Sequence, residues 1–176
     1  DACITEGTAA LFDGYRRMQG SSAEIASILN LPVVLLVNAR MAGYSVAPLL
    51  YGYKHFYSGV HIAGVIFNQV SSPAHYAHLR EACSDTGLDC LGYLPVMEGF
   101  KLSPKHNAIS LANRRIIDEQ ANLIASQIEK SIDINRMLNR CNRNFPCQYT
   151  LPYYSDTEDD MHTFPMHKIK IAIARD

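Results

Sequence analysis

The chain has 176 residues, which is enough for one ordinary domain with a buried core but short for two. Its 16 basic and 17 acidic residues give a net charge of −1, which excludes a general electrostatic attraction to nucleic acid or to an anionic membrane. With 48% hydrophobic and 19% charged residues, the composition is that of a globular protein rather than a disordered one. Because no basic-then-apolar signal peptide opens the chain, we expect a cytoplasmic protein without membrane or nucleic-acid partners.

The first part of the chain predicts a strand, a helix and a second strand. Residues 2–6 have the pattern of a short strand. Ser21 and Glu24 have the spacing of a capping box, which predicts a helix that begins after Ser21. The run Pro32–Asn38 is apolar on both faces, as expected for a buried strand of a parallel sheet.

Helices and strands continue to alternate through the middle of the chain. Ser45 is placed to cap a helix that carries Pro48 in its first turn, where proline is tolerated. Residues 61–68 predict a third strand. Ser72, followed directly by a proline, predicts the start of a helix that ends at Gly87.

A fourth strand and a long helix complete the predicted domain. Residues 90–94 have the strand pattern, and residues 110–130 carry an isoleucine-rich stripe typical of an amphipathic helix. Strands that alternate with helices predict an α/β fold of three layers, in which helices cover both faces of a mostly parallel sheet.

The composition changes after about residue 134, where Asn, Arg, Pro and Tyr become frequent. We expect the domain to occupy residues 1–140 and a linker with a solvated acidic run to occupy residues 141–167. Residues 168–176 alternate isoleucine with other residues and predict the first strand of a further domain. We therefore expect the chain to be a piece of a longer polypeptide and its fold to be incomplete.

The cysteines do not form a metal or disulfide pattern. They are Cys3, Cys83, Cys90, Cys141 and Cys147. Their number is odd and no CxxC spacing occurs in the sequence, so we expect reduced thiols rather than a disulfide framework or a zinc site. Cys141 and Cys147 flank a proline-containing turn and could pair on oxidation.

Two acidic residues follow the first predicted strand. Glu6 ends that strand beside Gly7, and Asp13 precedes Gly14 a short distance further on. Two carboxylates beyond a strand end could hold Mg²⁺ near phosphates. The alternative is that Glu6 caps a loop and Asp13 begins a turn, which is the more frequent role of an isolated acid–glycine pair.

Polar residues and a proline follow the other strands, where ligands bind in open parallel sheets. Arg40 could pair with a phosphate or a substrate carboxylate, although an arginine facing solvent is the more common arrangement. Asn68 could pair with an adenine edge through one donor and one acceptor, or brace the following loop. Leu94 and Pro95 could form one wall of an adenine slot, or Pro95 could simply stop the strand.

Other catalytic motifs are absent from the sequence. It contains no GxxxxGK[ST] phosphate loop and no GxSxG nucleophile elbow. His75 and His78 lie three positions apart on a predicted helix, but no third metal ligand has a suitable spacing. We therefore expect both histidines to be polar surface residues.

Taken together, these motifs resemble the cobyrinic acid a,c-diamide synthase family. The matching segments are residues 6–7, 11–14, 20–26, 31–35, 52–56, 62–68, 75–76, 91–95, 103–106 and 171–176. Lys105 stands where the family has an arginine. The resemblance is close up to about residue 110 and resumes at about residue 168, where it resembles the start of a glutamine amidotransferase domain.

The resemblance implies an ATP- and glutamine-dependent ligase of cobalamin biosynthesis, with a P-loop NTPase fold similar to dethiobiotin synthase. ATP would phosphorylate the a and c acetate carboxylates of a corrinoid polycarboxylate, and glutamine-derived ammonia would attack each acyl phosphate. The family resemblance places Glu6 at the Mg²⁺ site and Asp13, as a catalytic residue, at its substrate end. It places Asn68, Leu94 and Pro95 at the adenine of ATP, and it leaves a homodimer open.

The resemblance also implies missing parts. The phosphate loop is expected upstream of Asp1, and the glutaminase cysteine and histidine downstream of Asp176, so the chain alone is expected to be inactive. Two alternatives stay open. One is a cobyric acid synthase or dethiobiotin synthase relative with another substrate. The other is a regulatory or interaction domain derived from such a synthetase.

Overall fold

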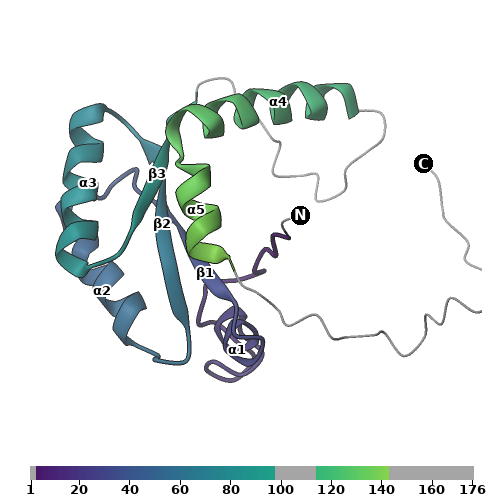
Figure 1. The fold of residues 1–176 in the computed structure, drawn as a ribbon, viewed down its shortest axis with the longest axis vertical. Helices are drawn as coiled ribbons and strands as arrows, with labels where there is room; N and C mark the ends of the chain where they lie inside the picture. Colours follow the sequence, from purple (N-terminus) through teal and green to yellow (C-terminus); the bar gives the residue numbers. More distant parts are fainter. Residues whose placement is uncertain (1–2, 98–113, 143–176) are drawn as a thin grey trace, which may run out of the picture. The chain divides into compact units, whose positions relative to one another are not determined.

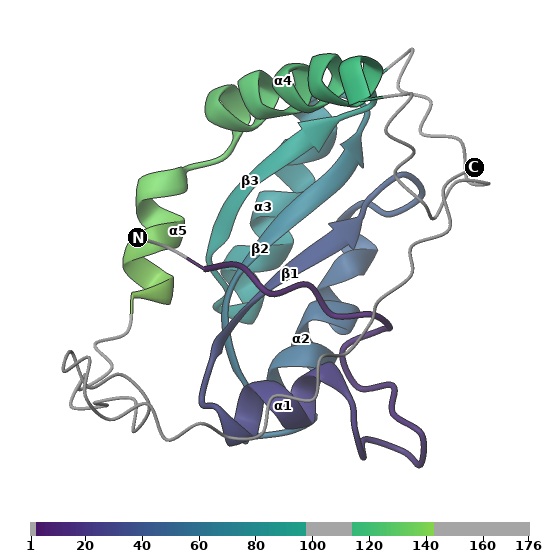
Figure 2. The ribbon, with the colours of Figure 1, turned by 90° about the vertical axis from the view of Figure 1, so that its right-hand side faces the viewer.

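The computed structural model describes residues 3–97 and 114–142, with side chains from residue 118 in the second range. Its sheet consists of three parallel strands in the order β1-β2-β3, and Figure 2 shows their arrows side by side, pointing the same way. The strands are β1 (Pro32–Asn38), β2 (His61–Val70) and β3 (Cys90–Pro95). The predicted strands at these positions are therefore confirmed, with β2 and β3 slightly longer than expected.

Helices lie on both faces of this sheet. They are α1 (Ser22–Ile28), the 3₁₀ turn η1 (Tyr44–Val46), α2 (Ala47–His55), α3 (Pro73–Thr86), α4 (Arg114–Ser131) and α5 (Ile134–Cys141). Figure 1 shows α2 and α3 on one face and α5 on the other, and each contacts the sheet. The predicted α/β class, with a parallel sheet between helices, is confirmed.

The two faces of the sheet are covered unequally. Leu35 and Val37 of β1 and Val65 and Phe67 of β2 are buried with apolar residues of α2 and α3 in one core. On the opposite face, Leu36 remains 65% exposed. The strand alternation places successive residues on opposite faces, so the core occupies the α2/α3 side.

Local capping signals set the ends of the helices as predicted. The Ser21 side chain accepts a hydrogen bond from the Glu24 N–H at 3.2 Å before α1. The Ser72 side chain accepts one from the His75 N–H at 3.1 Å before α3. Helix α3 ends at Gly87, whose φ of +63° is the left-handed conformation that favours glycine.

Lys54 joins two helices through the end of α3. Its ammonium donates hydrogen bonds to the carbonyl oxygens of Thr86 at 2.8 Å and Gly87 at 2.9 Å. A cation at a helix C-terminus satisfies carbonyl groups that have no partner within the helix and interacts favourably with the helix dipole. Lys54 therefore stabilises this fold. Its position in segment 52–56 of the family resemblance did not indicate this structural role.

Two sequence predictions are wrong. Residues 3–6 form no strand and pair with none of the three described strands, and Ile4 is 86% exposed. Ser45 does not cap α2, because it lies inside η1 and the residue before α2 is Val46, which makes no side-chain cap. Pro48 does lie in the first turn of α2, as expected.

Several predictions fall outside the described residues. The described part belongs to a compact unit that ends at Asn142. Only the first two residues of the predicted linker at 141–167 are described, and the predicted strand at 168–176 is not described at all. The domain boundaries therefore stay predictions. Cys3, Cys83, Cys90 and Cys141 are free thiols, as expected, while Cys147 is not described. No helix in the described ranges combines the length and apolar character that crossing a bilayer requires.

Candidate functional site

The carboxyl ends of β1 and β2 bring two asparagines together. The register of these strands places Asn38 opposite Asn68, and the Ala39 N–H donates a hydrogen bond to the Asn68 carbonyl at 2.8 Å. Residues opposite each other in a parallel pair carry side chains on the same face. The two amides therefore lie next to each other at the edge where ligands bind in open α/β sheets.

Each of these amides uses its oxygen locally. The Asn38 Oδ1 accepts a hydrogen bond from the Arg40 N–H at 3.0 Å, and the Asn68 Oδ1 accepts one from the Gln69 N–H at 2.8 Å. Asn68 therefore braces its own loop, which was one of the two alternatives. Its NH₂ group makes no hydrogen bond with another described residue, so two donors remain for a ligand.

An irregularity in β2 lies directly after Asn68. Gln69 has a φ of +61°, in the left-handed region, and the register between β2 and β3 shifts between Phe67 and Val70. A non-glycine residue held in that conformation stores about 1–3 kcal/mol of strain, and such strain is typical of functional sites. The sequence does not predict this conformation, because glutamine gives no signal for positive φ.

Leu94 and Pro95 end the neighbouring strand β3. Pro95 lies opposite Val70, and the Val96 N–H donates a hydrogen bond to the Val70 carbonyl at 3.1 Å. Both Leu94 and Pro95 are half-buried. The three residues predicted at the adenine thus come from the carboxyl ends of two adjacent strands, although no ligand contact tests that role.

Glu6 and Asp13 are exposed and precede α1. Their neighbours contact the same first turn of α1. Gly7 lies against the Ser22 side chain, and the Leu11 carbonyl accepts a hydrogen bond from the Ala23 N–H at 2.9 Å. The two acidic segments are thus anchored at one helical turn.

The carboxylates of this acidic pair have no partner among the described residues. Neither Glu6 nor Asp13 forms an ion pair or a side-chain hydrogen bond there. The Asp13 N–H donates to the Ala10 carbonyl at 2.9 Å, so Asp13 does lie in a turn. Within the same ranges, no three His, Cys, Asp or Glu residues form a group that could hold a metal. The magnesium assignment stays a prediction.

His75 is a structural link near the same edge. Its Nδ1 accepts a hydrogen bond from the Ser71 N–H at 3.2 Å, so the proton of the neutral ring lies on Nε2, 2.6 Å from the Ala42 carbonyl oxygen. His75 thus joins the loops that follow β1 and β2. The surface role predicted for it is wrong, whereas His78 is 63% exposed, as expected.

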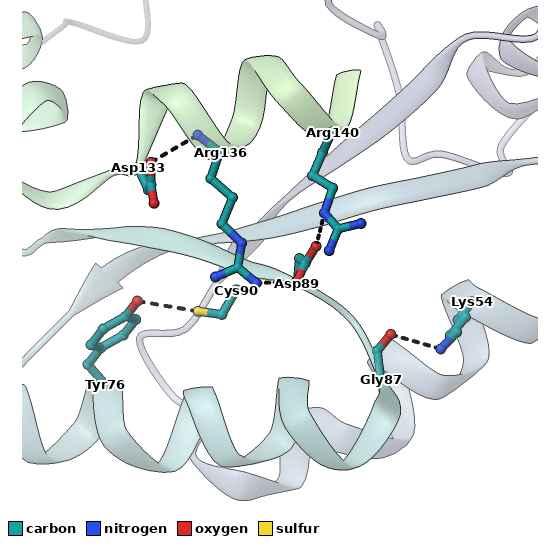
Figure 3. A network of polar contacts seen from close by, with 8 residues as sticks. All are labelled: Lys54, Tyr76, Gly87, Asp89, Cys90, Asp133, Arg136 and Arg140. Atoms are coloured by element: carbon teal, nitrogen blue, oxygen red, sulfur yellow. Dashed lines mark hydrogen bonds and ion pairs between the residues drawn. The ribbon is translucent and has the colours of Figure 1, made fainter. Parts of the chain in front are cut away.

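A second polar cluster lies at the opposite, amino end of β3 (Figure 3). The Tyr76 hydroxyl is 3.4 Å from the Cys90 sulfur. Hydrogen bonding from Cys83 and Tyr76, with Arg80 nearby, lowers the pKa of Cys90 to about 6. The same hydrogen bond and burial raise the pKa of Cys83. Cys90 begins β3, whereas Leu94 and Pro95 end it, so this cluster lies at the other end of the strand from the candidate site.

Ion pairs complete the amino-end cluster. Asp89 pairs with both Arg136 and Arg140 of α5, and the Asp133 side chain accepts a hydrogen bond from the Arg136 N–H at 2.9 Å (Figure 3). The Asp133 N–H also donates to the Leu91 carbonyl at 2.8 Å. These contacts hold α5 against β3. The polar groups of this cluster therefore form ion pairs and hydrogen bonds with one another.

Comparisons with known proteins agree with the resemblance seen in the sequence. A family model described as an AAA domain matches residues 1–102. Cobyrinate a,c-diamide synthase of Caldanaerobacter subterraneus subsp. tengcongensis is 33% identical over 179 residues, which cover 100% of this chain and 38% of the relative. The protein of the same name from Gloeobacter violaceus is 36% identical over 182 residues, covering 99% and 38%.

A third relative carries a different substrate in its name. Hydrogenobyrinate a,c-diamide synthase of Brucella ovis is 40% identical over 131 residues, which cover 74% of this chain and 29% of the relative. The chain therefore spans well under half the length of these relatives. No solved structure matches it significantly. Because the AAA-domain model matches more than half of its residues, the chain belongs to that family, and it is similar along its whole length to cobyrinate a,c-diamide synthases.

Proposed function

We propose that this chain is part of an ATP- and glutamine-dependent ligase that converts the a and c acetate carboxylates of cobyrinate into amides. The observation that carries the proposal is the similarity to cobyrinate a,c-diamide synthases over 99–100% of the chain. The AAA-domain match supports nucleotide binding. Because the chain spans 38% of those relatives, the activity is proposed for the full-length protein.

The carboxyl edge of the sheet would bind the adenine of ATP. Asn68 has two amide donors there that no described residue uses, and Leu94 and Pro95 provide apolar surface on the adjacent strand. An adenine edge offers ring nitrogens that accept such donors, while its face packs on apolar groups. This arrangement supports a base-binding role for the three residues.

Glu6 and Asp13 fit a magnesium ion bound together with phosphates. Mg²⁺ prefers oxygen ligands and usually takes only one or two carboxylates, with water and substrate phosphates completing its shell. Two exposed carboxylates that have no other partner among the described residues, anchored beside one helical turn, suit that requirement. When bound, the ion would neutralise charge on the transferred phosphoryl group.

In the proposed reaction, a substrate carboxylate attacks the γ-phosphorus of ATP and releases ADP. Ammonia derived from glutamine then attacks the acyl carbon, and inorganic phosphate leaves as the amide forms. Asp13 would act at the substrate end of the metal site, close to the carboxylate that reacts. Most of the catalysis would come from positioning and charge neutralisation.

The test uses the full-length protein with cobyrinic acid, ATP, Mg²⁺ and glutamine labelled with ¹⁵N at its amide. Two labelled amides per corrinoid, with matching ADP formation, are the expected products by mass spectrometry. A folded protein that forms neither amide nor ADP would contradict the proposal.

A metal-free substrate is the second candidate, because the Brucella ovis relative is named for hydrogenobyrinate. Parallel assays with hydrogenobyrinic acid compare kcat/KM for the two corrinoids directly. The larger value identifies the natural substrate class.

A further inference from the structure

The segment between Phe12 and α1 folds into a closed turn, here called the Arg16–Arg17 turn (residues 14–20). The Gly14 N–H donates to the Arg17 carbonyl at 2.8 Å, and the Tyr15 N–H donates to the Gln19 carbonyl at 3.0 Å. A Cβ at position 14 would collide with the carbonyl oxygens of Gln19 and Arg17, so only glycine allows this close approach. The backbone therefore holds two adjacent arginines in a defined place.

These arginines lack partners within the described ranges. Arg16 and Arg17 are exposed, and neither forms an ion pair with another described residue. Arg17 also has a φ of +55°, a conformation that is unfavourable for a residue with a side chain. No contact with another described residue compensates for the repulsion between these two cations or for the strain at Arg17. Their arrangement points to an anionic ligand.

The turn lines a cavity of about 650 Å³, together with an aromatic ring. The lining residues are Arg16, Arg17, Met18, Gln19, Glu24 and Phe56. Phe56 is 69% exposed, and its ring lies 5.0 Å from that of Phe12, which stacks on Tyr53. The Glu24 carboxylate already accepts the Gly20 N–H at 2.6 Å. The cavity therefore offers net positive charge beside a supported aromatic surface.

The chemistry of this cavity matches a flat molecule edged with carboxylates. Guanidinium groups bind carboxylates through two parallel hydrogen bonds, and aromatic rings pack against planar conjugated systems. Asp13 directly precedes this turn. Resting on the proposed function, we propose that Arg16 and Arg17 bind carboxylates of the corrinoid substrate while Phe56 packs against its macrocycle.

A phosphate of ATP could attract the same arginines, so the experiment separates the two anions. In the full-length protein, Arg16→Gln and Arg17→Gly each remove one cation. Glycine also relieves the conformation at position 17, so a loss caused by misfolding is not expected and thermal unfolding checks this. Arg80→Gln is the matched control, because Arg80 is an exposed arginine on α3 outside this cavity.

The measurements are the Kd for cobyrinic acid by calorimetry without ATP, and KM for each substrate. Each variant should raise the Kd for cobyrinic acid about tenfold and leave the KM for ATP unchanged. The Arg80→Gln control should have the wild-type Kd for cobyrinic acid. The weakening should decrease at high salt, where the wild-type interaction is already screened.

The outcomes separate this inference from the proposed function. A wild-type protein that binds cobyrinic acid through these arginines but forms no amide would contradict the proposed reaction alone. Amide formation with an unchanged corrinoid Kd in both variants would overturn the inference alone. An increase in the KM for ATP instead would assign the turn to phosphate, and a wild-type protein that binds no corrinoid would overturn both.

Discussion

The two ends of the sheet differ in how their polar groups are used. At the amino end of β3, Asp89 pairs with Arg136 and Arg140, and Cys90 contacts Tyr76. At the carboxyl end, the amide groups of Asn38 and Asn68 have donors that no described residue uses. The carboxylates of Glu6 and Asp13, which precede α1, likewise have no partner among the described residues. Groups that satisfy each other stabilise the fold, whereas groups left without partners are available to a ligand. The comparison thus separates groups with structural contacts from groups that are available to a ligand, without reference to a motif.

The largest expected effect comes from removing one unpartnered carboxylate. Glu6→Gln in the full-length protein keeps the size of the side chain but removes the charge that would face Mg²⁺. We expect kcat to fall by about a hundredfold or more, as is typical when a charged group at a phosphoryl-transfer site is lost. Because Glu6 is exposed and forms no ion pair with another described residue, the melting temperature should not change.

Steady-state turnover at saturating Mg²⁺ measures this effect, and circular dichroism checks the fold. Glu24→Gln is a poor control, because Glu24 accepts the Gly20 N–H, so Glu129→Gln, at an exposed glutamate on α4, serves instead. Wild-type turnover in Glu6→Gln would remove Glu6 from the metal site.

Asn68→Ala should affect ATP binding rather than the chemical step. Contacts to the adenine are made equally in the ground state and the transition state, so the KM for ATP should rise about tenfold while kcat changes little. The preference for ATP over GTP should also decrease. Asn68→Asp keeps an oxygen for the Gln69 N–H but removes the amide donors, so it separates ligand binding from bracing.

Initial rates with both nucleotides give the two KM values. If Asn68→Asp keeps the base selectivity of the wild type, the donors do not contact adenine. A large loss of stability in Asn68→Ala alone would indicate that its structural role dominates.

Sequence reasoning succeeded where the determining contacts are local. The caps of α1 and α3 use hydrogen bonds between residues three positions apart, and the apolar run of β1 identifies a buried strand without knowledge of its neighbours. It failed at residues 3–6, because a strand pattern cannot supply a pairing partner.

The candidate site shows the same division. The positions of Asn68 and Pro95 near strand ends were predictable, because each follows or ends a run of residues with a strand pattern. The left-handed Gln69 and the bond from His75 to Ala42, 33 positions away, were not, because they depend on the packing of separate loops. A turn at Asp13 and Gly14 was one of the two alternatives from the sequence, but its extent and the part of Arg16 and Arg17 in it were not predicted.

The amino-end cluster should control stability instead of activity. Asp89→Asn weakens two ion pairs that join β3 to α5, and the Asp89 side chain is only 19% exposed. Partly buried charge-assisted pairs of this kind are expected to contribute about 1–2 kcal/mol to the free energy of unfolding. Urea denaturation of the full-length protein measures the change, while the KM values should stay as in the wild type.

His78→Ala is the matched control for Asp89→Asn. The His78 and Glu81 side chains are 63% and 66% exposed at a separation of 3.6 Å, so their loss should cost less than about 0.5 kcal/mol. Equal effects of the two substitutions would mean that burial does not distinguish these pairs.

The smallest expected effect concerns the Cys90 thiol. Because its pKa is lowered to about 6, Cys90 should be largely thiolate at neutral pH, and its alkylation by iodoacetamide should slow as the pH falls through about 6. Cys83→Ala removes the main hydrogen bond that lowers this pKa, so it should move the rate profile to higher pH. Tyr76→Phe removes a weaker one and should move it less.

Mass spectrometry of the Cys90 peptide across pH 5–9 gives the profile, with Cys90→Ser as the blank. The proposed reaction does not use this thiol, so alkylation should leave the KM for ATP unchanged. If alkylation instead abolished ATP turnover while the protein remained folded, the two ends of the sheet would be coupled, and the division between structural and functional groups would fail. A midpoint near the ordinary pKa of a cysteine, about 8.5, would show that the cluster does not stabilise the thiolate.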